Sequence, residues 1–340
     1  MKSIKIGAAL TIFIGLCIFL ARLFAPDYTV ASLFETADSK EFKGAIFERN
    51  GEICRFDYSG RKIAILDGGG MYDPVLCPDK TRILYRRSVF ETAGNALQFG
   101  IIDMNGKPVL TMTIESEVSN DILDCRWLSD TAVGITTHIN PSTSEFFIYD
   151  AASGKVTGHY IGYLFAQIPD TEKIIYAENV PHWSDETVYH SFAVDEKTIY
   201  TSDILDARLY PPVFSEDVTK IAFMEGLPNS DGENGKEKWR IITADFDKNN
   251  MMLTNISSIE VPPEISGTLA FDSNNNLCLV NGNLLQVYDK NTSTFKQKEI
   301  TADVPDRSEE LKYFEELQKA VTKYWGDDSL EKINHINWIF

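Results

Sequence analysis

Between residues 28 and 300 the chain consists of short runs rich in β-branched and aromatic residues, each bounded by clusters of Asp, Asn, Ser, Gly and Pro. Residues 82–88 and 97–104 are typical of these runs, and their length is that of ordinary β-strands. Apolar positions at helical spacing occur after residue 300. The pattern predicts an all-β body followed by a C-terminal helix.

One motif recurs about every 46 residues: a β-rich run ends on an apolar residue and an aspartate, and a short polar turn leads into a second run. The intervals between successive aspartates are 46, 47, 45, 50 and 44 residues. The aspartates are Asp57, Asp103, Asp150, Asp195, Asp245 and Asp289. Such regular spacing predicts an internal repeat, and we interpret the aspartates as turn formers rather than catalytic groups.

A second turn lies upstream in each unit. Its copies are residues 76–80, 127–131, 168–171, 214–217 and 271–274. Two turns, each followed by a β-rich run, predict two hairpins and hence four strands per unit. The first unit needs residues 28–34 as its inner strand.

Six such units between residues 28 and 300 bury their faces by radial stacking. The predicted fold is therefore all-β, a six-bladed β-propeller of four-stranded antiparallel sheets, with five or seven blades as alternatives. An N-terminal transmembrane helix precedes it at residues 1–27, and an amphipathic helix and an apolar tail follow it at residues 301–340.

The upstream turn resembles the Ser-Pro-Asp-Gly turn of TolB-like propeller repeats, which also occur in the propeller domains of prolyl-oligopeptidase-type peptidases. Cys77-Pro78-Asp79 and Ile168-Pro169-Asp170 keep its core, although every copy lacks the glycine. The resemblance extends at class level to WD-repeat-like propellers, whose Gly-His and Trp-Asp pairs are missing here. It implies a propeller fold. A peptidase activity is not expected, because the chain has no Gly-x-Ser-x-Gly elbow.

The first 27 residues differ from the rest of the chain. Lys2 and Lys5 precede an uncharged apolar run from Ile6 to Ala21, which favours an uncleaved signal anchor with a cytoplasmic N-terminus. A cleaved signal peptide and a lipid attached at Cys17 are the alternatives. The anchor predicts a single-pass protein of the cell membrane, with the propeller on the extracytoplasmic side.

The charge narrows the classes of partner. The formal net charge is −18; residues 1–28 carry +2, so the remainder holds −20. No basic footprint for nucleic acid is present, and an acidic surface favours cations or basic partners. We expect a protein or a small ligand outside the membrane as the partner.

Cysteines and histidines give no metal or redox motif. Cys54, Cys77, Cys125 and Cys278 fall on apolar β-rich runs, which favours buried thiols over disulfides, with the pairing left open. The histidines show no ligand spacing; they are His138, His159, His182, His190 and His335. The sequence therefore predicts neither a metal nor another cofactor.

The C-terminal region predicts a helix over residues 309–325 that ends at Gly326. Its apolar stripe is expected to comprise Leu311, Phe314, Leu317 and Val321, packed on the propeller or bound to a partner. The tail that follows contains Ile333, Ile336, Trp338, Ile339 and Phe340. It is too apolar to be free, and we expect it to pack on the body of the protein or on a neighbouring protein.

Candidate binding residues come from the connections between the second and third strands of the units. These connections are long in units two, four and five, and binding residues concentrate on such loops. The candidate contacts are Phe90, Glu91, His182, Trp183, Asp185, Asp231 and Glu233. We predict no catalytic residue.

The leading hypothesis is a membrane-tethered, non-enzymatic binding module. The alternative is a lyase or glycoside hydrolase with an acidic site in the central channel, which paired carboxylates near the axis would favour. A structural spacer in an envelope assembly is a third hypothesis.

Overall fold

A computed structural model of the chain describes most of the residues beyond position 41. The described ranges are 42–89, 96–119, 121–141, 143–178, 190–204, 207–227, 238–262, 265–281, 284–299, 308–326 and 332–339. These ranges form antiparallel sheets and one helix, α2 (Ser308–Trp325). The all-β prediction is confirmed.

The first sheet draws its strands from both ends of the described chain. Its order is β24 (Ile333–Ile339), β1 (Gly44–Arg49), β2 (Glu52–Asp57) and β3 (Lys62–Gly68). β24 pairs with β1 from Ile339 opposite Gly44 to Ile333 opposite Arg49. The prediction that residues 28–34 supply the inner strand is wrong, because β24 and β2 pair with the two edges of β1.

The second sheet is a meander that follows the predicted strands of unit two closely. Its strands are β4 (Met71–Leu76), β5 (Arg82–Val89), β6 (Ala96–Asp103) and β7 (Pro108–Thr113).

The third sheet has seven strands, and its central strand, β11, pairs with a different strand along each of its halves. Its strands are β8 (Asp121–Trp127), β9 (Ala132–Asn140), β10 (Thr143–Asp150), β11 (Val156–Gln167), β12 (Ile174–Glu178), β13 (Ser191–Val194) and β14 (Lys197–Thr201). The first half of β11 pairs with β10 and the second half with β12, with a bulge at Tyr163–Ala166.

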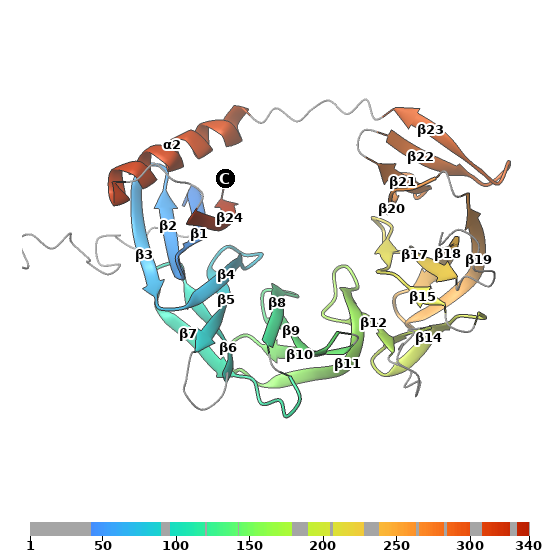
Figure 1. Ribbon diagram of the computed structural model, residues 1–340, viewed down its shortest axis with the longest axis horizontal. Coiled ribbons are helices and arrows are strands. Elements are labelled where there is room, and N and C mark those ends of the chain that lie inside the picture. Colours follow the sequence, from blue (N-terminus) through green and yellow to red (C-terminus); the bar gives the residue numbers. More distant parts are fainter. Residues whose placement is uncertain are drawn as a thin grey trace, which may run out of the picture.

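Two further sheets complete the arc that Figure 1 shows. One contains β15 (Arg208–Leu209), β16 (Val213–Phe214), β17 (Lys220–Leu227), β18 (Lys238–Asp247) and β19 (Met252–Val261). The other contains β20 (Thr268–Phe271), β21 (Leu277–Asn281), β22 (Leu284–Asp289) and β23 (Thr294–Glu299).

Four of the repeated aspartates, Asp57, Asp103, Asp150 and Asp289, hold their turns by local hydrogen bonds, whereas Asp195 is bonded by Tyr160 and Lys173. Asp57 accepts the N–H of Ser59 at 2.9 Å, and Asp150 accepts that of Ser153 at 2.7 Å. These are Asx-type turns, in which the side chain bonds its own backbone two or three residues on. Asp245 was predicted to be such a residue, but it lies within β18, and Asp247 forms the turn instead.

The hydrophobic core lies between successive sheets. Phe99 and Ile135 belong to a cluster shared by the second sheet and strands β8–β10, and Phe192 and Phe223 to one shared by β13 and β17. One face of the first sheet packs against α2. Phe47 of the sheet and the buried residues of the helix belong to one hydrophobic cluster. Sheets fanned around an axis with cores between them are the arrangement of a propeller.

The helix confirms its predicted range, but the predicted apolar stripe is partly wrong. Leu317 and Val321 are fully buried, whereas Leu311 is 63% and Phe314 38% exposed. Tyr313 and Ala320 occupy the buried face instead. The reason is that the first sheet accommodates only the face centred on Leu317, so residues six and three positions before it turn toward solvent.

In the described residues four cysteines are buried and are not joined in disulfides: Cys54, Cys77, Cys125 and Cys278. Burial raises the pKa of the Cys77 thiol to about 12, and hydrogen bonding to Asp79 contributes. Burial also raises the pKa of Cys54 and Cys125. The prediction of buried thiols is confirmed for these residues.

Among the described residues, no helix combines the length and the apolar character needed to cross a membrane. The predicted anchor at residues 1–27 lies outside these ranges.

Candidate functional site

The candidate contacts chosen from the sequence lie outside the described residues. Phe90 and Glu91 fall between β5 and β6, His182, Trp183 and Asp185 between β12 and β13, and Asp231 and Glu233 between β17 and β18. All of these connections leave the same end of their sheets, because each joins the second strand of a unit to the third. Their role stays a prediction.

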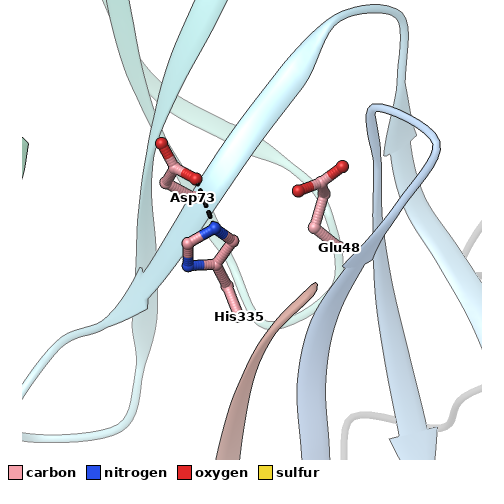
Figure 2. Close-up of side chains that lie close together, drawn as sticks. All are labelled: Glu48, Asp73 and His335. Atoms are coloured by element: carbon pink, nitrogen blue, oxygen red, sulfur yellow. Dashed lines mark ion pairs between the residues drawn. The ribbon is translucent and has the colours of Figure 1, made fainter. Parts of the chain in front are cut away.

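At that same end, on the inner side of the arc, three chemically active side chains come together (Figure 2). Glu48 comes from β1, Asp73 from β4 and His335 from β24. One ligand atom from each lies within 4.8 Å of the other two. The Nε2 atom of His335 is 2.6 Å from an oxygen of Asp73.

Two bulges on neighbouring inner strands bring Asp73 and His335 into contact. The β4–β5 register shifts between Tyr72 and Val75, and the β1–β24 register shifts between Ile46 and Glu48. Asp73 has a φ of +54° and His335 a φ of +51°. The left-handed region is uncommon for residues other than glycine, and a bulge re-aims the side chain that it carries.

A similar bulge with a positive φ also occurs elsewhere in the fold. Leu164, at the bulge of β11, also has a positive φ, of 57°. Its side chain packs against apolar neighbours. A bulge therefore sets the direction of the side chain that it carries. The polar cluster forms because the residues at two of these bulges are Asp73 and His335.

Two further side chains hold the cluster in place. Arg86 donates a hydrogen bond through Nε to the second oxygen of Asp73, and through Nη1 to the carbonyl of Ile122 at 3.2 Å. The side-chain amide of Asn337 donates to the carbonyl of Pro74 at 2.7 Å. Arg86 of β5 thus orients the carboxylate of Asp73, and Asn337 joins the bulged parts of β4 and β24.

Glu48 is the buried member of the cluster. It is 5% exposed, and its Oε1 accepts the backbone N–H of Gly51 at 3.2 Å. Figure 2 shows one oxygen of its carboxylate on the side of His335 and Asp73. The side chain of His335 is 51% exposed and that of Asp73 is 27% exposed, so solvent reaches the cluster.

A second buried glutamate, Glu145 on β10, has a complete set of partners. Ser116 donates to it at 2.5 Å, Ser119 also donates, and Nε2 of His159 lies 3.0 Å away. Burial acts to raise the pKa of Glu145, but these hydrogen bonds outweigh it and the pKa is lowered. Since serine and histidine bond the same carboxylate and not each other, this is no nucleophile–base pair.

A third buried glutamate, Glu225 on β17, joins two sheets. It is fully buried, and it accepts hydrogen bonds from Tyr200 of β14 at 3.2 Å and from Arg240 of β18. Arg240 also donates to Asp203. This network fixes the end of the β17–β18 hairpin from which residues 228–237 depart.

Cys77, Asp79 and Asp130 also bring their ligand atoms together. Asp130 accepts the backbone N–H of Asp79 at 3.0 Å, and Asp79 accepts that of Thr81 at 2.9 Å. Arg82 lies 3.8 Å from Asp79. These hydrogen bonds explain why the three side chains lie together, and they join two turns of the fold.

A pocket of about 320 Å³ lies between β17–β19 and β20–β22. Its charged lining residues are Lys220, Asp245 and Lys290. Hydrogen bonds from Asn255 and Lys220 lower the pKa of Asp245. The lining thus has one cation in excess, unlike the acidic chain as a whole.

The sequence did not predict the cluster of Glu48, Asp73 and His335. Its residues come from three strands, and the histidine belongs to a segment interpreted as a tail. Two carboxylates and an imidazole at this spacing can share a cation or transfer a proton.

Comparisons with known proteins bear on the fold. No protein-family model matches the chain, and no curated protein matches it. The β-propeller domain of the Trilobed protease from Pyrococcus furiosus is similar over 75% of this chain and 80% of its own, with 13% identity and a TM-score of 0.44.

Two further solved structures are similar. TolB from Acinetobacter baumannii covers 75% of this chain and 63% of its own, with 15% identity and a TM-score of 0.33. A member of the duf4221 family from Bacteroides vulgatus covers 76% of this chain and 93% of its own, with 12% identity and a TM-score of 0.35. The expected resemblance to TolB-like propellers is found, and at these identities it concerns the fold alone.

Proposed function

We propose that the protein is a membrane-anchored, extracytoplasmic propeller that binds a protein or a small ligand without catalysing a reaction. The supporting observation is the unequal length of the connections at the two ends of the sheets. Residues 90–95, 179–190 and 228–237 join second to third strands, whereas third and fourth strands are joined by short turns such as 195–196 and 58–61. Long connections on a rigid scaffold are where binding residues concentrate.

Six blades follow if the seven-stranded sheet counts as two units that share β11. β24 then completes the first blade, and the short strands β15 and β16 together form the inner strand of the fifth. The buried networks of Glu145 and Glu225 stabilise the end of the sheets that carries the long connections, which suits a binding face.

Site-specific photo-crosslinking in cells tests the proposed face. A photoreactive residue at Phe90 or Trp183 samples the long connections, and one at Ser153 or Asn291 samples turns at the opposite end as a matched control. Intact-mass analysis detects adducts of a protein or a small ligand. Adducts from the first pair alone support the proposal, and equal labelling at both ends contradicts it.

The membrane anchor rests on Lys2, Lys5 and the apolar run that follows them. An alkaline phosphatase reporter, which is active only outside the cytoplasm, tests the topology when fused after Phe340. Activity is expected. An inactive phosphatase together with an active cytoplasmic reporter at the same position would contradict the proposed orientation.

The second candidate is an enzyme with an acidic site near the axis. The observation that favours it is the proximity of the carboxylates of Glu48 and Asp73, beside His335. Turnover of a glycoside and polyuronate panel, lost in Glu48→Gln and kept in the exposed control Glu172→Gln, would place this candidate first. No turnover by the wild-type chain would remove it.

A further inference from the structure

We propose that Glu48, Asp73 and His335 bind a divalent transition-metal ion of the zinc type at the junction of β1, β4 and β24. This inference goes beyond the proposed binding function. It would give the C-terminal strand a further attachment to the propeller, in addition to its backbone pairing with β1 and the hydrogen bond from Asn337 to Pro74.

The ligand set fits such an ion. Zinc accepts imidazole nitrogen and carboxylate oxygen at ~2.0–2.2 Å, so neighbouring ligand atoms of a tetrahedral ion lie about 3.4 Å apart. The three atoms here already lie within 4.8 Å of one another. An imidazole among the ligands favours zinc over magnesium or calcium, which prefer oxygen alone.

Glu48 supplies an independent indication. The other two deeply buried glutamates of the sheets, Glu145 and Glu225, each accept hydrogen bonds from at least two side chains. Within the described residues Glu48 receives a single bond, from the N–H of Gly51. One oxygen of its carboxylate lies on the side of His335 and Asp73 (Figure 2). A buried carboxylate is usually paired or bound to a metal, and a cation is the partner that Glu48 lacks.

The surrounding side chains orient the ligands by hydrogen bonds, as groups around the ligands of known metal sites do. Arg86 bonds one oxygen of Asp73 and leaves the other toward His335. Asn337 fixes the carbonyl of Pro74 at 2.7 Å and that of His335 at 3.1 Å. The ion would replace the proton shared by His335 and Asp73. The exposed side of His335 leaves a route for entry and room for water as a further ligand.

Zinc binding to the full-length chain, stripped of metal with EDTA and dialysed, tests the proposal by isothermal titration. We expect one equivalent to bind, and His335→Asn to weaken binding about 10- to 100-fold or more. Asparagine suits the left-handed backbone at residue 335, so this variant retains the fold. The matched control is His159→Asn, which removes another exposed histidine beside a buried glutamate and leaves zinc binding unchanged.

Two further readouts decide the assignment. Cobalt should give a visible d–d spectrum that His335→Asn and Glu48→Gln abolish, and zinc should raise the melting temperature of the wild type but not of His335→Asn. Circular dichroism checks folding, and if Glu48→Gln does not fold, His335→Asn decides alone. Absence of stoichiometric binding, or equal binding by wild type and His335→Asn, would overturn the proposal.

Discussion

The side chain of Asn337 on β24 donates a hydrogen bond of 2.7 Å to the backbone carbonyl of Pro74 on β4, although 263 residues separate the two in the sequence. The same amide bonds the carbonyl of His335 at 3.1 Å. One side chain therefore ties the C-terminal strand of the first sheet to the innermost strand of the second.

Replacing Asn337 by alanine should lower the free energy of unfolding by about 1–3 kcal/mol, because two carbonyl groups lose their donor. Asn334→Ala, at an exposed position of the same strand, should change it by less than about 0.5 kcal/mol. Urea unfolding of the full chain measures both. Equal effects of the two variants would mean that the Asn337 contact does not stabilise the fold.

The docking of α2 gives a second matched pair. Leu317 is fully buried against the first sheet and Leu311 is 63% exposed. Leu317→Ala should cost about 2–5 kcal/mol of unfolding free energy, and Leu311→Ala less than about 0.5 kcal/mol. Thermal and urea unfolding test this. A large cost at Leu311 would show that the sequence-based stripe, and not the structure, describes the packed face.

The ion pair of Glu225 and Arg240 should be costly to break from one side. Glu225→Gln leaves Arg240 without its buried charge partner, and we expect a loss of about 3–5 kcal/mol. A double variant, Glu225→Leu with Arg240→Met, should regain much of it, since well-packed apolar residues often replace a buried pair without loss. The exposed Glu172→Gln is the control. Equal costs for Glu225→Gln and Glu172→Gln would contradict a stabilising role for the network.

The contribution of Glu145 to stability should depend on pH. Its pKa in the folded protein is lowered, because hydrogen bonds from Ser116, Ser119 and His159 outweigh the effect of burial. A depressed folded pKa gives stability that is fully present above the unfolded value of about 4.3 and is lost as the pH falls through the folded value.

Glu145→Gln should therefore cost about 1.5–3 kcal/mol at pH 7 and progressively less as the pH falls from 5 toward 3. Urea unfolding of both chains over this range measures the difference. A difference that stays constant or grows on acidification would show that the carboxylate form is not the stabilising one.

The turns and most strands could be predicted because their chemistry is local. Asp57 and Asp150 bond backbone groups two or three residues away, so their sequence neighbourhood contains the whole interaction. The prediction was wrong at Asp245 because Asp247, two residues later, can form the same kind of turn and does so.

The first sheet and the polar cluster could not be predicted for the opposite reason. β24 finds its partner β1 at the other end of the described chain, and no local motif marks that pairing. His335 becomes a neighbour of Asp73 only after two bulges turn both side chains, and a bulge leaves no distinct mark in the sequence, as Leu164 demonstrates. The predicted apolar stripe of the helix was partly wrong for a similar reason. The sequence alone allows Leu311 and Leu317 on one broad apolar face, and only packing against the sheet determines which side is buried.

Hydrogen exchange of residues 333–339 in the full-length chain tests most directly whether the C-terminal strand completes the first sheet. Pairing with β1 from Gly44 to Arg49 predicts that the β24 amides facing β1 are protected to the same extent as the β20 amides facing β21, because each is an edge strand of its sheet. Exchange of residues 333–339 at the rate of an unstructured peptide, with β1 still protected, would contradict it.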